Sequence, residues 1–147
     1  MIPRSALLLG LAGLIPFFWG AATLFSGTLV EFGISNLGPR FVAPFLLLSY
    51  GQIILVFMAG ALWGFASSGD ERVLPLGLAL SIVPVLWVMF AAGNGPTEAA
   101  TYLIAGFLGI LGIDWTFSRY QLVPDWWMKL RILLTTPVVL CLLFLVI

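Results

Sequence analysis

The sequence contains no histidine and a single cysteine, Cys141. Without histidine and with one thiol, the chain lacks the residues of the usual zinc sites, of histidine-ligated haem and of iron–sulfur clusters. It also lacks the serine–histidine and cysteine–histidine arrangements of nucleophilic catalysis. One cysteine cannot close an internal disulfide. We therefore predict that the chain is not an enzyme and has no catalytic or metal site.

Charged residues are few and balanced. Six basic and six acidic side chains give a formal net charge of zero at pH 7. This balance provides neither a basic surface nor an acidic tail, so we predict no nucleic-acid partner. Gly106, Gly109 and Gly112 recur inside an apolar segment rather than after a strand, which does not match a phosphate-binding or dinucleotide-binding loop.

Hydrophobic residues make up 62% of the 147-residue chain, and charged residues only 8%. Ordinary soluble domains have roughly 45–50% and about 25%. A soluble domain of this size leaves roughly a third of its unfolded surface exposed, so this much apolar surface has to face lipid. We therefore predict an integral membrane protein whose partners include the surrounding membrane lipid.

Polar and Pro/Gly clusters divide the apolar sequence into five segments. A helix needs about 20 residues to cross roughly 30 Å of hydrocarbon, and turn-forming residues near Pro39, Gly69, Asn94 and Pro124 mark the breaks. We predict an all-α fold, a multi-pass transmembrane bundle of five helices in one domain, 1–147. The predicted helices cover residues 5–25, 41–65, 73–92, 97–117 and 125–147.

The first segment has features of a secretory signal, with Arg4 followed by an apolar run. That run exceeds the roughly 7–15 residues of a signal core, so we expect a retained helix. Several predicted spans contain proline, which can kink a membrane helix. These prolines are Pro16, Pro44, Pro84 and Pro137.

The basic residues predict the orientation. With five spans, the N-terminus and the second and fourth loops share one side of the membrane, and only Arg40 lies on the other. The positive-inside rule makes the basic side cytoplasmic, or the matrix side in an organelle, and directs the C-terminus outward. Most tryptophans near the basic side are expected to be interfacial anchors. The basic residues on that side are Arg4, Arg72, Arg119, Lys129 and Arg131.

A polar group lies near the middle of the second predicted span, where Gln52 follows Ser49 and Tyr50. Tyr50 and Gln52 are candidates for a hydrogen bond to a quinone-like ligand or a polar substrate. A bond to a neighbouring helix or to the backbone is the alternative. We favour this structural interpretation, because such interhelical bonds are common in membrane proteins.

Two charged residues fall inside spans near the cytoplasmic end, Asp114 in the fourth and Arg131 in the fifth. An unpaired charge at that depth would be costly, so we predict a structural Asp114–Arg131 ion pair, with Arg119 as the competing partner. A proton relay is the alternative. It is less favoured, because a permanent cation stabilises the charged form of its neighbouring carboxylate.

Small residues recur at helical spacing in two spans. Gly60 and Gly64 form a GxxxG pair in the second span, and a longer row follows one face of the fourth. Such rows let helix backbones approach closely, so we predict helix packing there. A flat ligand or the helix of a partner would fit the same faces. The row in the fourth span is Thr101, Ala105, Gly109 and Gly112.

Several segments together resemble a family of membrane proteins catalogued as a domain of unknown function, which includes transmembrane protein 69 of mitochondria. The similar segments are residues 10–17, 50–64, 80–87 and 125–131, followed by Leu134-Thr135. The resemblance covers nearly the whole chain, although Ala59-Gly60 stands where two glycines are expected. It implies a bacterial inner-membrane setting with a mitochondrial relative, and no established activity.

Two functions fit these observations. The preferred one is a non-catalytic accessory or assembly subunit of a larger inner-membrane complex of respiratory or photosynthetic electron transport. The alternative is a small carrier or a lipid- or quinone-binding protein built around Tyr50 and Gln52. Five helices do not divide into two equal inverted repeats, which weakens the carrier interpretation. No cofactor is expected beyond a bound lipid, quinone or pigment.

Overall fold

A computed structural model describes residues 1–147. As predicted, the chain is all α: it has seven α-helices, one short 3₁₀ helix and no strand. Three stretches are long and apolar enough to cross a membrane, Arg4–Phe25, Phe45–Ser67 and Pro96–Arg119. The elements are α1 (Arg4–Ala12), α2 (Ile15–Phe25), α3 (Gly27–Asn36), η1 (Pro39–Phe41), α4 (Phe45–Ser67), α5 (Leu74–Phe90), α6 (Pro96–Arg119) and α7 (Trp127–Leu143).

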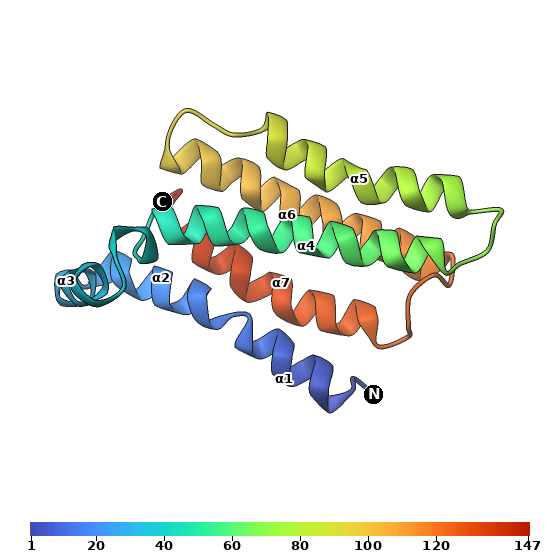
Figure 1. The fold of residues 1–147 in the computed structure, drawn as a ribbon, viewed down its shortest axis with the longest axis horizontal. Helices are drawn as coiled ribbons and strands as arrows, with labels where there is room; N and C mark the ends of the chain where they lie inside the picture. The colour runs from blue at the N-terminus through green and yellow to red at the C-terminus, as the bar shows by residue number, and fades with distance from the viewer.

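The helices α4 to α7 lie side by side along the long axis of the molecule (Figure 1). α1 and α2 follow one another along the side of this bundle, and α3 lies across its end (Figure 1). The N-terminus and the C-terminus lie at opposite ends (Figure 1). α4 is the central helix, because it packs against α2, α5, α6 and α7.

One face of α4 forms the core of the bundle. Buried residues recur along it every three or four positions, which keeps them on one side of the helix. Small residues alternate there with leucines, so neighbouring helices approach closely at the small positions. A Cβ added to Gly77 of α5 would lie 2.8 Å from the Ala66 Cβ of α4. The buried α4 residues are Leu46, Leu47, Gly51, Leu55, Ala59, Leu62 and Ala66.

The first predicted span is two helices rather than one, because α1 ends at Ala12 and α2 begins at Ile15. The cause is Pro16, whose ring would collide with the carbonyl of Ala12 one turn earlier. The break leaves the Gly13 carbonyl without a backbone donor. The hydroxyl of Tyr50 on α4 donates to this carbonyl at 3.0 Å. A side chain from the central helix thus replaces the missing backbone bond, as the interior of a membrane requires.

The predicted first loop contains a helix, α3, which the sequence analysis did not assign. Ser26 caps its start, with the side-chain oxygen accepting the Leu29 N–H at 3.4 Å. The short η1 helix after α3 is fixed by Trp19 of α2, which donates its indole N–H to the Phe41 carbonyl at 2.8 Å. Gly33 allows α3 to approach closely, because a Cβ there would lie 3.3 Å from the Trp19 ring and closer still to Val42.

The other helix limits differ modestly from those predicted. α4 begins at Phe45 rather than at residue 41, because Pro44 disfavours helical backbone in the residue before it. α5 (Leu74–Phe90) and α7 (Trp127–Leu143) are shorter than the predicted 73–92 and 125–147, and α6 (Pro96–Arg119) is longer than 97–117. Pro84 and Pro137 lie inside α5 and α7 without ending them.

We expect Gly77→Ala to lower the free energy of unfolding by about 1–3 kcal/mol, because the new methyl group would push α5 away from Ala66. Unfolding in mixed micelles by titration with a denaturing detergent measures this loss. Gly60→Ala is the matched control, since its Cβ would meet no atom within 4 Å. That control should be neutral or stabilising by up to about 1 kcal/mol. Equal losses in the two variants would contradict this account of the α4–α5 contact.

Candidate functional site

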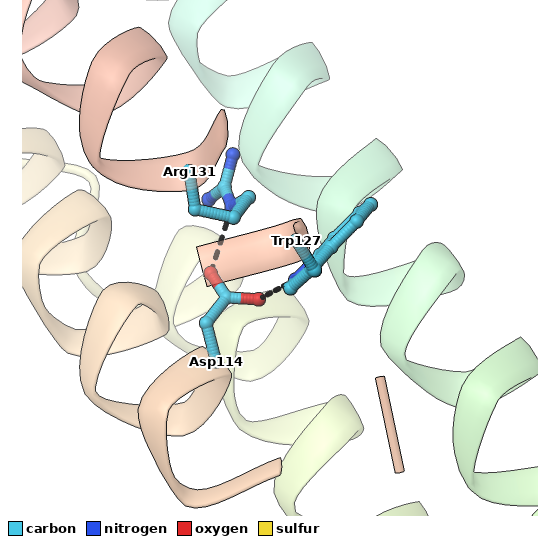
Figure 2. Close-up of polar contacts among 3 residues, drawn as sticks. All are labelled: Asp114, Trp127 and Arg131. Atoms are coloured by element: carbon cyan, nitrogen blue, oxygen red, sulfur yellow. Dashed lines mark hydrogen bonds and ion pairs between the residues drawn. The ribbon is translucent and has the colours of Figure 1, made fainter. Parts of the chain in front are cut away.

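A buried carboxylate, Asp114, lies at the contact between α6 and α7 and is 1% exposed. Arg131 donates its Nε–H to Asp114 Oδ2 at 2.7 Å. Trp127 donates its indole N–H to Asp114 Oδ1, also at 2.7 Å. Figure 2 shows the two α7 side chains converging on the carboxylate. Their spacing of four residues places both on the same face of α7.

The aromatic ring of Trp127 is itself held from α4. Phe65 packs edge-on against it, with the ring centroids 4.8 Å apart and an interplanar angle of 76°. The cluster of Asp114, Trp127 and Arg131 therefore links three helices. Arg119, the competing partner in the sequence analysis, instead lies over the Trp115 ring, 5.5 Å from its centroid.

Two polar atoms beside this cluster have no partner. Arg131 Nη2 and Thr135 Oγ1 are buried and make no hydrogen bond, and each residue is 3% exposed. Leaving a buried donor unpaired costs about 1–3 kcal/mol, and more when the group is charged. Asp114 accepts one hydrogen bond at each oxygen, from the Trp127 indole and from Arg131 Nε. Neither orphaned atom receives a partner from this cluster.

These orphaned side chains line a cavity of about 320 Å³. Its volume falls in the range of small-molecule sites, roughly 300–1,000 Å³. Twelve of its 16 lining residues are hydrophobic, so it suits an apolar molecule with a small polar group. The cavity holds no nucleophile beside a base. Its walls come from α1 (Ala6, Leu9, Gly10), the α1–α2 break and α2 (Gly13, Leu14, Phe17), α4 (Ile54, Phe57, Met58), α6 (Phe107) and α7 (Trp127, Leu130, Arg131, Leu134, Thr135, Val138).

The structure separates Tyr50 and Gln52. The Tyr50 hydroxyl is bound to the Gly13 carbonyl, and its ring packs against Phe17, with the centroids 5.0 Å apart. Gln52 borders a hollow of only about 10 Å³ beside Trp87 and Tyr102. The two polar side chains therefore do not form a common ligand site.

The predicted packing residues face away from the chain's own core. Thr101, Ala105, Gly109 and Gly112 are all exposed on α6, as are Gly60 and Gly64 on α4. An added Cβ at any of the four glycines would meet no atom within 4 Å. The glycines that admit close helix contacts within the chain are others, including Gly20, Gly51, Gly77 and Gly106.

The sequence analysis missed the roles of Trp127 and Thr135. Trp127 is one of the tryptophans near the basic side that were expected to be interfacial anchors, yet it is buried and bound to Asp114. A spacing signal was available, because residues 127, 131 and 135 are each one helical turn apart and share the face that carries the buried charge. No group of three or more His, Cys, Asp or Glu side chains is placed to hold a metal ion.

Comparison with known proteins identifies relatives over nearly the whole chain. The family described as "Protein of unknown function (DUF3429)" matches residues 2–147. Transmembrane protein 69 of Xenopus tropicalis is 36% identical over 141 residues, covering 93% of this chain and 51% of that protein. Transmembrane protein 69 of Mus musculus is 32% identical over 139 residues, covering 90% and 51%. No solved structure matches the chain.

These matches confirm the resemblance drawn from the sequence. The chain spans about half the length of the relatives that it matches. Their name and the three long apolar helical stretches establish it as a membrane protein.

We expect Trp127→Phe to lower the free energy of unfolding by about 1–3 kcal/mol, because Asp114 Oδ1 would lose its donor in a buried position. Detergent-titration unfolding, followed by circular dichroism, measures the change. The matched control is Trp126→Phe, one residue away on a half-buried side chain that makes no hydrogen bond. If the control loses as much stability as Trp127→Phe, the indole–carboxylate bond does not hold α6 to α7.

Proposed function

Because the chain belongs to the DUF3429 family of proteins of unknown function, we propose a function from its own geometry. In this proposal the chain is a five-span protein of the bacterial inner membrane that serves as a non-catalytic accessory or assembly subunit. Its host is a larger complex, of the electron-transport class. The host class is supported by the resemblance rather than by the geometry, because the resemblance implies a setting common to bacterial inner membranes and mitochondria.

Two shorter helices complete the five proposed spans. α5 and α7 have 17 residues each, which is the lower end of the 17–25 residues that cross a bilayer. Both run alongside the longer α4 and α6 (Figure 1). The two linkers that flank α5 lie at opposite ends of the bundle, and so do the α6–α7 linker and the C-terminus that flank α7 (Figure 1).

The basic residues support the proposed orientation. The N-terminus, the α4–α5 linker and the α6–α7 linker lie at one end of the bundle (Figure 1), with Arg4, Arg72 and Lys129 close to them. Arg40 lies at the other end, in η1. By the positive-inside rule the N-terminal end is cytoplasmic and the C-terminus faces outward.

The observation that carries the accessory role is the unused face of α6. Thr101, Ala105, Gly109 and Gly112 are exposed along it, and Ala105 and Gly109 border a groove of about 300 Å³ between α5 and α6. A glycine that faces lipid gains nothing from side-chain packing. A row of small residues, in contrast, allows the backbone of a second helix to approach closely. The proposed occupant of this face is a helix of the host complex.

The alternative of a carrier or ligand-binding protein built around Tyr50 and Gln52 has less support. The Tyr50 hydroxyl is occupied by the Gly13 carbonyl. The hollow beside Gln52, at about 10 Å³, has room for about one water molecule. Neither side chain is placed to receive a substrate.

Reporter fusions test the five-span arrangement. We expect alkaline phosphatase to be active when it is fused after Ile147 and inactive in the α4–α5 linker, because an odd number of spans places these positions on opposite sides. A fluorescent reporter that matures only in the cytoplasm should give the reciprocal pattern. Finding the N-terminus and the C-terminus in one compartment would contradict five spans.

A bulky substitution on the α6 face tests the accessory role. We expect Gly109→Leu to reduce the fraction of the chain in its native-gel complex by about tenfold or more, because overpacking a helix contact costs roughly 1–3 kcal/mol. The free energy of unfolding of the isolated variant should equal that of the wild type, since a Cβ at Gly109 meets no atom of the chain within 4 Å.

The matched control is Ile53→Trp, which adds bulk at an exposed position on another helix, α4. It should leave the complex intact. Three results would contradict the accessory role. These are migration of the wild-type chain only as a free small species, equal effects of the two variants, and a complex that contains only copies of this chain.

A further inference from the structure

The cavity beside Arg131 has a polar part that nothing in the chain satisfies. We propose that this cavity binds an uncharged, largely apolar molecule through a carbonyl oxygen that accepts hydrogen bonds from Arg131 and Thr135. The site lies between α1, α4 and α7. The inference does not depend on the accessory role, because the cavity and the exposed face of α6 involve different residues.

The guanidinium of Arg131 is only partly used by the fold. Its Nε donates to Asp114, while Nη2 is buried and has no partner. Nη2 makes no hydrogen bond within the chain, so an acceptor from another molecule would satisfy it.

The hydroxyl of Thr135 is bonded differently from that of the next residue. Thr136, the next residue, donates its hydroxyl to the carbonyl of Ile132 at 2.9 Å. This bond to the preceding turn is the usual way to satisfy a hydroxyl in a membrane helix. Thr135 is buried without such a bond and lines the cavity one turn from Arg131. The two side chains thus offer donors to the same space.

The rest of the cavity is suited to an apolar body. Leu9 of α1 and Ile54, Phe57 and Met58 of α4 form the wall. Phe57 is 65% exposed on the outer surface, so this side of the cavity borders the lipid. A molecule dissolved in the membrane can therefore reach the site without crossing water.

Charge selects a neutral ligand over an anion. Asp114 already neutralises Arg131 at 2.7 Å, so the buried pair has no net charge. A carboxylate or phosphate ligand would add an uncompensated negative charge to an apolar site, which is strongly unfavourable. A carbonyl oxygen accepts the same hydrogen bonds without that cost. Quinones and the ester groups of neutral lipids are two sources of this chemistry.

Binding by the full-length chain in nanodiscs tests the proposal. The nanodiscs contain ether-linked phospholipids, which have no ester carbonyls to compete for the site. Four probes share a ten-carbon tail: decylbenzoquinone, monodecanoylglycerol, decanoate at pH 8 and decylbenzene. Binding is measured by the rise in unfolding temperature and by a change in tryptophan fluorescence, since Trp127 lines the cavity.

We expect a carbonyl probe to bind more tightly than decylbenzene and decanoate. Thr135→Val should weaken that binding about 3- to 10-fold, because it removes one hydrogen bond and keeps the side-chain shape. The matched control, Thr136→Val, should leave the affinity unchanged. Preference for decylbenzoquinone identifies a quinone as the source, and preference for monodecanoylglycerol identifies a neutral lipid ester.

Each other outcome overturns the proposal. Equal binding of decylbenzene would mean that the polar end is not recognised. Tighter binding of decanoate would refute the charge argument. If no probe binds, or if Thr135→Val and Thr136→Val have the same effect, the cavity is not a carbonyl site. None of these outcomes bears on the native-gel complex, so the accessory role is judged separately.

Discussion

The buried Asp114 carboxylate, with its two donors from α7, is the interaction on which the arrangement of the last two helices depends. A carboxylate inside an apolar bundle is tolerated only when its charge and its oxygens are satisfied. Arg131 supplies the opposite charge and Trp127 supplies the second donor, both at 2.7 Å. Since Phe65 packs against Trp127, the rotation of α7 about its axis is fixed relative to both α6 and α4.

That same arrangement creates the cavity. Fixing Arg131 toward Asp114 brings Thr135 to the neighbouring position on the same face of α7. α1 packs against α7, and the break before Pro16 separates it from α2. The orphaned donors are therefore a direct result of how the ion pair orients α7.

Much of the fold could be predicted, because hydropathy reports which segments avoid water. The apolar segments and the contact between Asp114 and Arg131 follow from the cost of unpaired polar groups in lipid. The break at Gly13 was harder to predict, since proline in a membrane helix causes anything from a mild bend to a full interruption. Pro84 and Pro137, which leave α5 and α7 continuous, show the other outcome.

The faces of the helices could not be predicted from spacing alone. Gly60 and Gly64 have the spacing of a packing motif, yet other glycines, among them Gly51 and Gly77, face neighbouring helices. In a soluble protein the polar face of a helix would identify the exposed side. In lipid both faces are apolar, so the sequence does not distinguish a contact within the chain from a contact with another molecule. The cavity was missed for the same reason, because its walls come from five separate parts of the chain.

The unequal lengths of the helices affect how the protein fits its bilayer. α4 and α6 have 23 and 24 residues, whereas α5 and α7 have 17 each, which corresponds to roughly 35 Å against 25 Å. In the proposed five-span arrangement, a bundle with two short members matches a thin hydrocarbon layer best, and its longer members extend into the headgroup region. Trp115 and Arg119 lie on the last turns of α6, where an indole and a guanidinium interact favourably with lipid headgroups. In that arrangement, the shortest helices set the depth of the whole bundle in the membrane.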